Sequence, residues 1–418
     1  MASAFDVDTI RQQFPALART LGGQPAVFFD GPAGSQVPQS VAEAISAYLL
    51  STNANHEGLF ASSRESDAIL HAAHQAVADF LGADDPDCIV FGANMTTLTF
   101  ALSRALSQTW QPGDEIIVTR LDHDANVSPW MLAARDRGVT VQQVDIDPVD
   151  CTLRMDDFEA KLSSRTKLVA VGYASNLVGT INPVAEIIEK AHAVGAQVFV
   201  DAVHYAPHGL IDAAALDCDF LACSAYKFFG PHVGMLFGKR EHLESVEAYK
   251  VRPSPQEIPS KWMTGTQNHE GIAGVLAAID YFAEFGRSLV GDSLGRREAI
   301  TAAFSAIETY ERDLLVRLLD GLAKLSGVKV YGITASDRLD QRVPTVSFTH
   351  ERLSPTEIAA SLGKRGFFTW DGNSYALPLT EALNLEPNGV VRVGLLHYNT
   401  AEEVDRLIAC LGELFDAR

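Results

Sequence analysis

Short apolar runs alternate with longer amphipathic stretches through much of the chain, and this alternation indicates the fold class. Several of the runs are apolar at every position, as in strands that a parallel sheet buries on both faces. Strands are predicted at Cys88–Phe91, Glu115–Thr119, Val139–Val144, Lys167–Val171, Gln197–Val200, Phe220–Cys223 and Met235–Phe237, with helices between them at Met95–Leu106, Ser128–Arg135 and Val184–Ala193. This order predicts an α/β fold in which helices cover both faces of a parallel sheet and ligands bind at the carboxyl ends of its strands.

The pattern changes near Gly286, where a long helical segment of about Asp292 to Leu325 follows. Isolated strands are then predicted at Val328–Tyr331, Val343–Phe348 and Val390–Gly394, with a last helix at Ala401–Leu414. We therefore expect a large domain over residues 21–285 and a smaller C-terminal α+β domain over residues 286–418, with residues 1–20 as an arm that packs on the small domain. The Pro- and Gly-rich stretch Arg252–Gly265 predicts a long loop, and such loops are usually functional.

The composition excludes several classes of partner. The 33 basic and 53 acidic residues give a net charge of −20 with no basic patch, which argues against nucleic acid and anionic membranes. The longest apolar runs are far shorter than the roughly 20 residues of a membrane span, and Met1–Arg11 lacks the pattern of a signal peptide. The five cysteines are scattered without a CxxC pair, so we expect no structural zinc site, no disulfide framework and a cytoplasmic location.

Asp201 and Lys227 are the first candidates for chemistry. Asp201 closes an apolar strand, and Lys227 follows the next one among aromatic residues. Apolar surroundings lower the pKa of a lysine, and its neutral amine can form a Schiff base with a carbonyl. An Asp and a Lys at neighbouring strand ends are the pair that pyridoxal phosphate requires, because the Lys holds its aldehyde and the Asp keeps its pyridine nitrogen protonated. From these two residues alone, an ordinary surface lysine and a turn aspartate remain the alternative.

A phosphate site is predicted nearby. The segment 92–97 follows a strand and opens a helix, so Thr96 or its neighbour Met95 is placed to bind phosphate at the helix N-terminus, although Thr96 and Thr97 also suit simple helix capping. Ser224, three residues before Lys227, offers a second hydroxyl.

Several motifs in one order then carry a family resemblance. They are Phe29–Ser35, Asp122–Asn126 with Pro129–Trp130, Ala174–Thr180, Val200–Asp201, Ser224–Lys227, Gly265–Asn268, Val391–Gly394 and Tyr398–Thr400. From about Phe28 to Leu414 the chain resembles the class V group of fold-type I pyridoxal-phosphate enzymes, and within it the cysteine desulfurases. The resemblance implies a large, mainly parallel αβα sandwich domain with a smaller C-terminal α+β domain.

The resemblance also implies roles for individual residues. His123 is similar to the histidine that stacks on the pyridine ring and moves protons, and Asn176 to the asparagine that orients the substrate carboxylate and the ring oxygen. Arg392 resembles the arginine that binds the α-carboxylate, a role that suits a planar guanidinium. Thr266 matches the residue that reaches the phosphate of the neighbouring subunit, which implies a homodimer with a shared active site. Without the resemblance, a polar loop histidine and a surface ion pair would account for His123 and Arg392.

Two positions depart mildly from the desulfurase pattern. His204 stands where desulfurases have a glutamine that donates to the ring oxygen, and a neutral imidazole can also donate. Tyr226 stands where they have a histidine that contacts the phosphate, and its hydroxyl can donate in the same way.

One departure concerns the reaction itself. In the loop Gly366–Leu379, Tyr375 stands where desulfurases carry the cysteine that attacks the substrate sulfur, and Trp370 stands where an arginine is expected. A phenol is a poor substitute for a polarisable thiolate. We therefore expect no desulfurase activity of the usual kind, and either a loop in which Trp370 and Tyr375 bind another substrate or a loop that only packs at the dimer edge.

The function predicted from the sequence is an enzyme that acts on an amino acid through an external aldimine with pyridoxal phosphate. Transamination, β-elimination (including C–S lysis), racemisation and epimerisation all remain open. A non-catalytic pyridoxal-phosphate-binding regulatory protein is the alternative from another class, but such a protein has no need for Lys227. A nicotinamide-dependent oxidoreductase is excluded by the lack of a glycine fingerprint between a strand and a helix.

Overall fold

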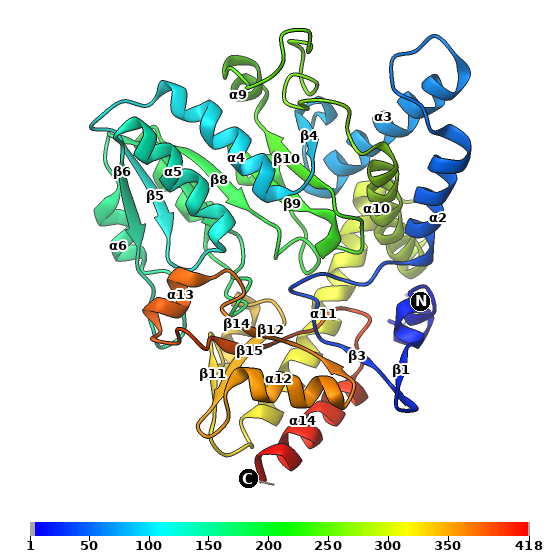
Figure 1. Ribbon diagram of the computed structural model, residues 1–418, viewed down its shortest axis with the longest axis vertical. Helices are drawn as coiled ribbons and strands as arrows, with labels where there is room; N and C mark the ends of the chain where they lie inside the picture. The colour runs from blue at the N-terminus through cyan, green and yellow to red at the C-terminus, as the bar shows by residue number, and fades with distance from the viewer. Residues whose placement is uncertain (1–4, 417–418) are drawn as a thin grey trace.

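The computed structural model describes residues 5–416, and its upper part in Figure 1 is built on a seven-stranded sheet. The strands are β4 (Ile89–Gly92), β5 (Glu115–Thr119), β6 (Thr140–Val144), β7 (Thr166–Gly172), β8 (Gln197–Asp201), β9 (Phe220–Ser224) and β10 (Gly234–Gly238), in the spatial order β4-β10-β9-β8-β7-β5-β6. All of them are parallel except β10, which runs antiparallel to both of its neighbours. The predicted α/β class and mainly parallel sheet are confirmed.

The reversal of β10 was not predicted, and the length of its connection explains it. Parallel neighbours need a crossover of a dozen or more residues, usually a helix, whereas only nine residues separate Ser224 from Gly234. That connection holds a single 3-10 turn, Ala225–Lys227, so the chain turns back along β9.

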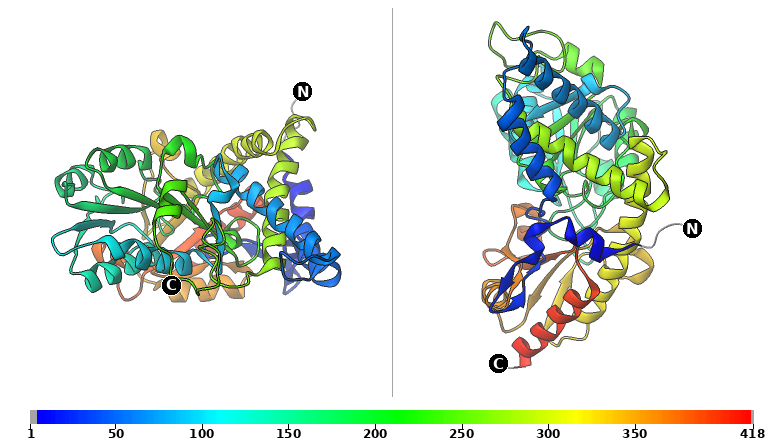
Figure 2. Two further views of the ribbon diagram at one scale, coloured as in Figure 1. Left: turned by 90° about the horizontal axis from the view of Figure 1, so that it is seen from above. Right: turned by 90° about the vertical axis from the view of Figure 1, so that its right-hand side faces the viewer.

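Helices cover both faces of this sheet, as Figure 2 shows. They include α4 (Met95–Leu106), α5 (Ser128–Arg137), α6 (Met155–Lys161), α7 (Val184–Ala193), α8 (Ala213–Leu216) and α9 (Arg240–Ser245), together with α2 (Gln39–Ala47), α3 (Ala61–Leu81) and α10 (His269–Val290). Strands β5, β7 and β9 are almost entirely buried, which fits their near-continuous apolar sequence, whereas the edge strand β6 is only partly buried. The stretch 246–268, between α9 and α10, has no helix or strand, as predicted for Arg252–Gly265.

The lower part of Figure 1 contains a second, antiparallel sheet. Its strands are β11 (Val328–Tyr331), β12 (Thr345–His350), β14 (Trp370–Gly372) and β15 (Val390–Gly394), in the order β11-β12-β15-β14. Around it lie α12 (Pro355–Lys364), α13 (Leu377–Ala382) and α14 (Ala401–Asp416), and β13 (Phe367–Phe368) pairs with β3 (Val27–Phe28) near the N-terminus.

The long helix α11 (Arg296–Leu322) joins the two parts, because its first half belongs to one apolar core and its second half to the other. Ile300 and Phe304 pack with the large sheet, whereas Leu315 and Leu318 pack with the small one. Helix α10 continues through Gly286. The division at residues 20 and 285 remains a proposal, and residues 1–4 of the predicted arm lie outside the described part of the chain.

The start of α4 matters for the site described below. Asn94 is its N-cap, and its side-chain oxygen accepts hydrogen bonds from the backbone N–H and the hydroxyl of Thr97, each at 2.9 Å. The cap therefore uses Thr97, whereas no hydrogen bond of the Thr96 hydroxyl is found within residues 5–416. None of the helices in that range has the length and apolar character that crossing a bilayer requires.

Candidate active site

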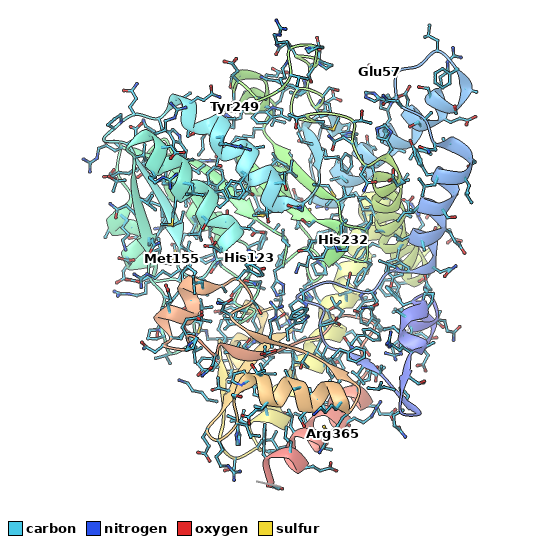
Figure 3. All side chains as sticks on the ribbon, viewed as in Figure 1. Glu57, His123, Met155, His232, Tyr249 and Arg365 are labelled. Atoms are coloured by element: carbon cyan, nitrogen blue, oxygen red, sulfur yellow. The ribbon has the colours of Figure 1, made fainter. Side chains whose placement is uncertain are left out.

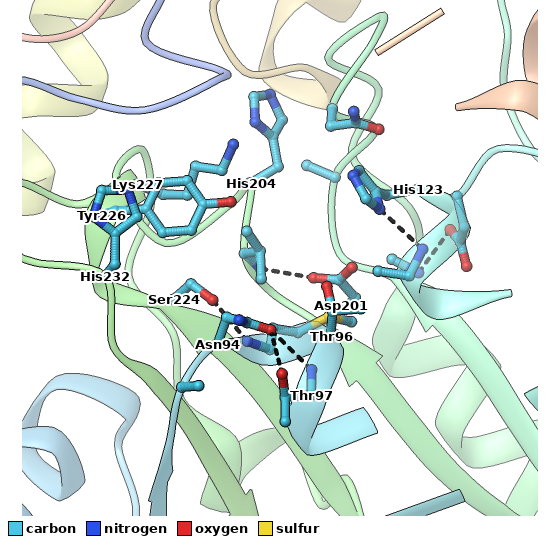
Figure 4. Close-up of a pocket in the computed structure, with 18 residues that line it drawn as sticks. Asn94, Thr96, Thr97, His123, Asp201, His204, Ser224, Tyr226, Lys227 and His232 are labelled. Atoms are coloured by element: carbon cyan, nitrogen blue, oxygen red, sulfur yellow. Dashed lines mark hydrogen bonds between the residues drawn. The ribbon is translucent and has the colours of Figure 1, made fainter. Parts of the chain in front are cut away.

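A cavity of about 610 Å³ opens at the carboxyl ends of the parallel strands (Figure 4). Its walls come from the ends of β7, β8 and β9, from the start of α4 and from the segment after β5. The lining residues are Ala93, Asn94, Met95, Thr96, Thr97, Asp122, His123, Ala125, Gly172, Ala174, Asn176, Asp201, Val203, His204, Ser224, Tyr226, Lys227 and His232. Every residue that the sequence analysis assigned to the cofactor lines this cavity, with the exception of Thr266.

Asp201 is the last residue of β8 and is buried, with 7% of its surface exposed. One carboxylate oxygen accepts a hydrogen bond from the Val203 N–H at 2.9 Å. Burial raises the pKa of this carboxyl group to about 6, and the charge of Lys227 partly opposes the rise. A buried carboxylate at this depth is suited to a protonated nitrogen of a bound ring.

Lys227 lies in the turn after β9, and its ammonium group donates a hydrogen bond to the Pro32 carbonyl. It lies 4.8 Å from the centre of the Tyr226 ring. Burial and then the positive charge of Arg392 lower the pKa of Lys227 to about 7, against the effect of Asp201. At neutral pH, a large fraction of this amine is therefore unprotonated and nucleophilic.

The N-terminus of α4 lies beside Ser224. The Met95 N–H donates to the Ser224 hydroxyl at 2.9 Å, which ties the helix to the end of β9. Thr96 and Tyr226 extend the same wall of the cavity. The positive end of a helix dipole together with nearby hydroxyls forms a site that suits a phosphate.

His123 follows β5. Its label in Figure 3 lies between the upper and lower parts of the molecule. Its Nδ1 accepts a hydrogen bond from the Ala125 N–H at 3.0 Å, and burial lowers its pKa to about 4, so the ring is neutral. The preceding Asp122 is buried and accepts from the Gly172 N–H and the Asn126 amide, at 2.8 and 3.0 Å. These contacts fix the segment that carries the imidazole.

His204 forms the wall beyond Asp201. Its Nε2 lies 2.9 Å from the Thr345 hydroxyl, and burial holds its pKa well below the ordinary value for a histidine. The ring is therefore neutral and retains one N–H to donate. Behind it, His208 makes an edge contact with His204 and a 2.7 Å contact with the carboxylate of Glu311.

Asn176 lines the cavity, and Arg392, which is not among the lining residues, contacts its backbone. Nη1 of Arg392 donates to the Asn176 carbonyl at 2.8 Å, and the guanidinium is buried. Burial lowers the pKa of Arg392 to about 10, with Asp30 opposing, so the group is still charged at neutral pH. Two buried polar atoms, Nε of Arg392 and Oδ1 of Asn176, have no hydrogen-bond partner, which is the condition of a site built for a polar ligand.

Tyr375 and Trp370 lie outside the lining of the cavity. Tyr375 stacks on His123, with the ring centroids 5.4 Å apart and the planes 21° from parallel. Trp370 lies on β14 opposite Arg392 of β15, and half of its surface is exposed. Thr266 is exposed in the stretch between α9 and α10 and reaches no part of the cavity of its own chain.

The sequence analysis missed His232, Asn94 and Asp122. His232 stacks on Tyr226 at 5.1 Å from within the turn that leads into β10. Its position depends on the conformation of that turn, in which Phe229 has a φ of +69°, and no sequence pattern indicated this. Asn94 was detectable, because an asparagine directly before a predicted helix is a strong N-cap signal.

The groups in the cavity fit those of pyridoxal phosphate. An amine with a lowered pKa, a buried carboxylate at a strand end and a helix N-terminus suit its aldehyde, its pyridine nitrogen and its phosphate. The unpaired Nε–H of Arg392 can donate to a carboxylate, and the unpaired Oδ1 of Asn176 can accept from an N–H or O–H group of a ligand.

Comparison with known proteins yields one family. The model of the class-V aminotransferase family matches residues 27–407. An aminotransferase-like protein of Gibberella zeae is 33% identical over 420 residues, which cover 98% of both chains. A cysteine desulfurase of Synechococcus elongatus is 31% identical over 98% of this chain, although the chain spans only 64% of that relative's length.

Solved structures of cysteine desulfurases are also similar to this chain. A cysteine desulfurase of Thermococcus onnurineus superposes with a TM-score of 0.87 at 28% identity over the full length of both chains. A cysteine desulfurase of Escherichia coli gives a TM-score of 0.84 at 28% identity, covering 99% of this chain and all of the other.

Proposed function

Because the chain belongs to the class-V aminotransferase family, whose members are pyridoxal-phosphate-dependent enzymes, we propose that it removes the α-proton of an amino acid without transferring sulfur. The observation that supports the second part is the position of the thiols. All five cysteines are buried, none lines the cavity, and burial raises the pKa of Cys88 to about 12 and that of Cys151 to about 11. From the resemblance in sequence, we infer that Tyr375 stands at the position of the desulfurase nucleophile.

In this proposal, bound pyridoxal phosphate supplies an aldehyde for covalent attachment of amines and a ring that accepts electrons from the α-carbon. Lys227 is the amine that attaches to the aldehyde, and Asp201 keeps the ring nitrogen protonated. The start of α4, Ser224 and Tyr226 bind the phosphate, and the neutral ring of His204 donates to the ring oxygen.

The substrate is held by its carboxylate. Arg392 pairs with it through the N–H groups that are not used by the Asn176 carbonyl, and the second N–H of the Asn176 amide, whose first N–H donates to the Ser374 carbonyl, donates to it. The Lys227 amine, whose pKa burial and the charge of Arg392 lower to about 7, would be suited to accept the α-proton at neutral pH. His123 lines the cavity after β5 and, being neutral, would be able to donate or accept a proton.

The subsequent step decides between transamination, β-elimination and racemisation, and these differ in where a proton returns or which group leaves. The experiment is a panel of amino acids added to the purified protein, with detection of keto acids, released thiols or amines, and inverted enantiomers. The protein is expected to be yellow, with an absorbance band that borohydride bleaches and that Lys227→Ala lacks. A colourless protein that cannot be reconstituted with pyridoxal phosphate would refute the enzyme assignment.

The absence of sulfur transfer has a separate test. With cysteine and a reductant, the holoenzyme is expected to release little sulfide. Brisk release that survives Cys→Ser replacement at all five positions would show that this fold performs the reaction without a thiol, contrary to the proposal.

We also propose a homodimer with a shared active site. Thr266 does not reach its own cavity, and Leu50, Leu59 and Phe60 beside α2 and α3 expose 84%, 89% and 58% of their surfaces. Apolar side chains gathered in this way mark an interface, and a two-fold dimer is the commonest solution. Sedimentation is expected to show a dimer that Leu59→Asp with Phe60→Glu weakens and that Val149→Asp, an equally exposed control, leaves intact.

The five unpaired cysteines support a cytoplasmic location, because thiols stay reduced there. Fractionation of the source cells would test this part of the proposal.

A further inference from the structure

The loop that carries Tyr375 is held in an unusual backbone conformation. Ser374 and Tyr375 have φ values of +51° and +61°, in the left-handed region that residues with a side chain seldom adopt. Such strain persists only where neighbouring groups enforce it, and it concentrates at functional sites.

Four hydrogen bonds enforce this conformation. Within the loop, Asn373 accepts from the Tyr375 N–H through its side chain at 3.1 Å and from the Ala376 N–H through its carbonyl at 2.8 Å. From the large sheet, the Asn176 amide donates to the Ser374 carbonyl at 2.8 Å, and the Asp124 N–H donates to the Tyr375 carbonyl at 2.7 Å. The loop is therefore held by Asn176, which lies beside the carboxylate site, and by Asp124, which follows His123 in the chain.

The side chain that this loop displays has little to pack on. Tyr375 leaves 73% of its surface exposed, and its only ring partner within residues 5–416 is His123. Trp370 and Leu377 of the same loop are 51% and 39% exposed. A fixed aromatic face beside His123, which lines the cavity, and with apolar neighbours, is arranged for contact with another molecule.

The carboxylate groups around this face accept hydrogen bonds from within the protein. Asp371 accepts from the Thr356 hydroxyl, Asp124 from the Ser128 hydroxyl, and Glu386 from the Asn373 amide and the Thr380 hydroxyl. His123 is neutral, with its pKa lowered by burial to about 4. The guanidinium of Arg392 is assigned to the substrate carboxylate, and the carboxylates of Asp124, Asp371 and Glu386 would repel an acidic side chain at the Tyr375 face.

We propose that Tyr375 is a specificity-determining residue, and that the substrates are α-amino acids with a large apolar or aromatic side chain. This inference rests on the proposed function. With the carboxylate at Arg392 and Asn176, the side chain extends toward the face of the Tyr375 ring, while the hydrogen bond from Asn176 to the loop holds that face in place. The methyl group of alanine offers little apolar area for this contact, and an acidic side chain would meet the carboxylates of Asp124, Asp371 and Glu386.

The test measures the affinity of the holoenzyme for phenylalanine, leucine, alanine and aspartate through the change in cofactor absorbance. Phenylalanine and leucine are expected to bind about 10-fold or more tightly than alanine, and aspartate more weakly still, as one well-placed apolar contact allows. In Tyr375→Ala, the ratio of phenylalanine to alanine affinity is expected to fall close to one. Tyr375→Phe retains the ring and should retain the ratio.

Tyr249→Ala is the matched control, because Tyr249 is 57% exposed and lies at the top of the molecule in Figure 3, away from His123. It should leave the ratio at the wild-type value. A wild-type preference for alanine or aspartate, an unchanged ratio in Tyr375→Ala, or a lost ratio in Tyr375→Phe would overturn the inference. If no amino acid alters the absorbance at all, the proposed function itself fails, which is a distinguishable result.

Discussion

Gly234 of β10 lies directly against Asn94, so that a Cβ atom built on Gly234 would lie 2.4 Å from the carbonyl carbon of Asn94. The absence of a side chain at this glycine lets β10 approach the loop that opens α4. The same strand position pairs with Gly92 on one side and Ser224 on the other. The phosphate wall, where the Met95 N–H meets the Ser224 hydroxyl, is therefore built around this contact.

Gly234→Ala is expected to displace Asn94 and the start of α4, and to cost about 1–3 kcal/mol of stability through overpacking. The affinity of the apoenzyme for pyridoxal phosphate should fall, and an absorbance titration would measure it. Gly363→Ala is the control, since no atom lies within 4 Å of its built Cβ, and in the last turn of α12 it should stabilise by up to about 1 kcal/mol. Unchanged cofactor affinity in Gly234→Ala would show that the start of α4 does not bind the phosphate.

Much of the fold could be predicted because its signals are local. The bounds of α4, α7, β5, β11 and β15 match the prediction to the residue, since apolar runs there end at polar caps or turns. Around Gly286 the hydrophobic pattern changes, but the pattern did not reveal that one helix, α10, passes through this residue. A Cβ there would lie 1.8 Å from the Ala299 carbonyl oxygen. A glycine required for close helix packing cannot be distinguished from a helix breaker by local sequence.

The site residues that could be predicted are those at the ends of predicted strands. Asp201, Ser224 and Lys227 entered the cavity because the carboxyl ends of parallel strands converge there. The stacking of Tyr375 on His123 and of His232 on Tyr226 depends on how distant segments and a tight turn are placed, and periodicity contains no such information.

The pKa of Lys227 predicts how cofactor attachment depends on pH. Burial and Arg392 lower this pKa to about 7, so the neutral, nucleophilic amine increases as the pH rises through 7 and is nearly complete by about pH 8. The rate at which the apoenzyme binds pyridoxal, a probe without the phosphate, should rise about tenfold per pH unit below 7 and level off above it.

Arg392→Gln removes a positive charge that disfavours the protonated lysine, so the midpoint should move to higher pH. The measurement is the absorbance of the attached aldehyde after rapid mixing, with borohydride trapping to assign the site to Lys227. A rate that continues to rise toward pH 10 would show that Lys227 has an ordinary pKa.

His232 lies against the ring of Tyr226, on the wall that also contains Ser224. Its imidazole can support the phosphate directly or by holding the Tyr226 ring in place. His232→Ala is expected to weaken the binding of pyridoxal phosphate about 10-fold, as for the loss of a hydrogen bond to a charged group. Binding of pyridoxal should change far less.

His56→Ala, which removes an exposed histidine outside the cavity lining, is the control. An equal loss for both ligands would assign His232 to the stability of the turn and not to the phosphate.

Arg392 makes two separable contributions, because Nη1 is occupied by the Asn176 carbonyl while Nε has no partner. Arg392→Lys keeps the positive charge but removes the planar fork that pairs with a carboxylate. The affinity for an amino acid should fall roughly 10- to 100-fold, as for the loss of a charge-assisted pair. The affinity for the corresponding amine without a carboxylate should stay nearly constant, as should the cofactor absorbance.

Arg342→Lys is the matched control, since Arg342 is equally buried and its guanidinium donates to the backbone carbonyls of Ile333, Val178 and Thr345. It should lower the melting temperature and leave both affinities unchanged. Equal losses for the amino acid and the amine in Arg392→Lys would mean that Arg392 organises the cavity and does not bind the carboxylate.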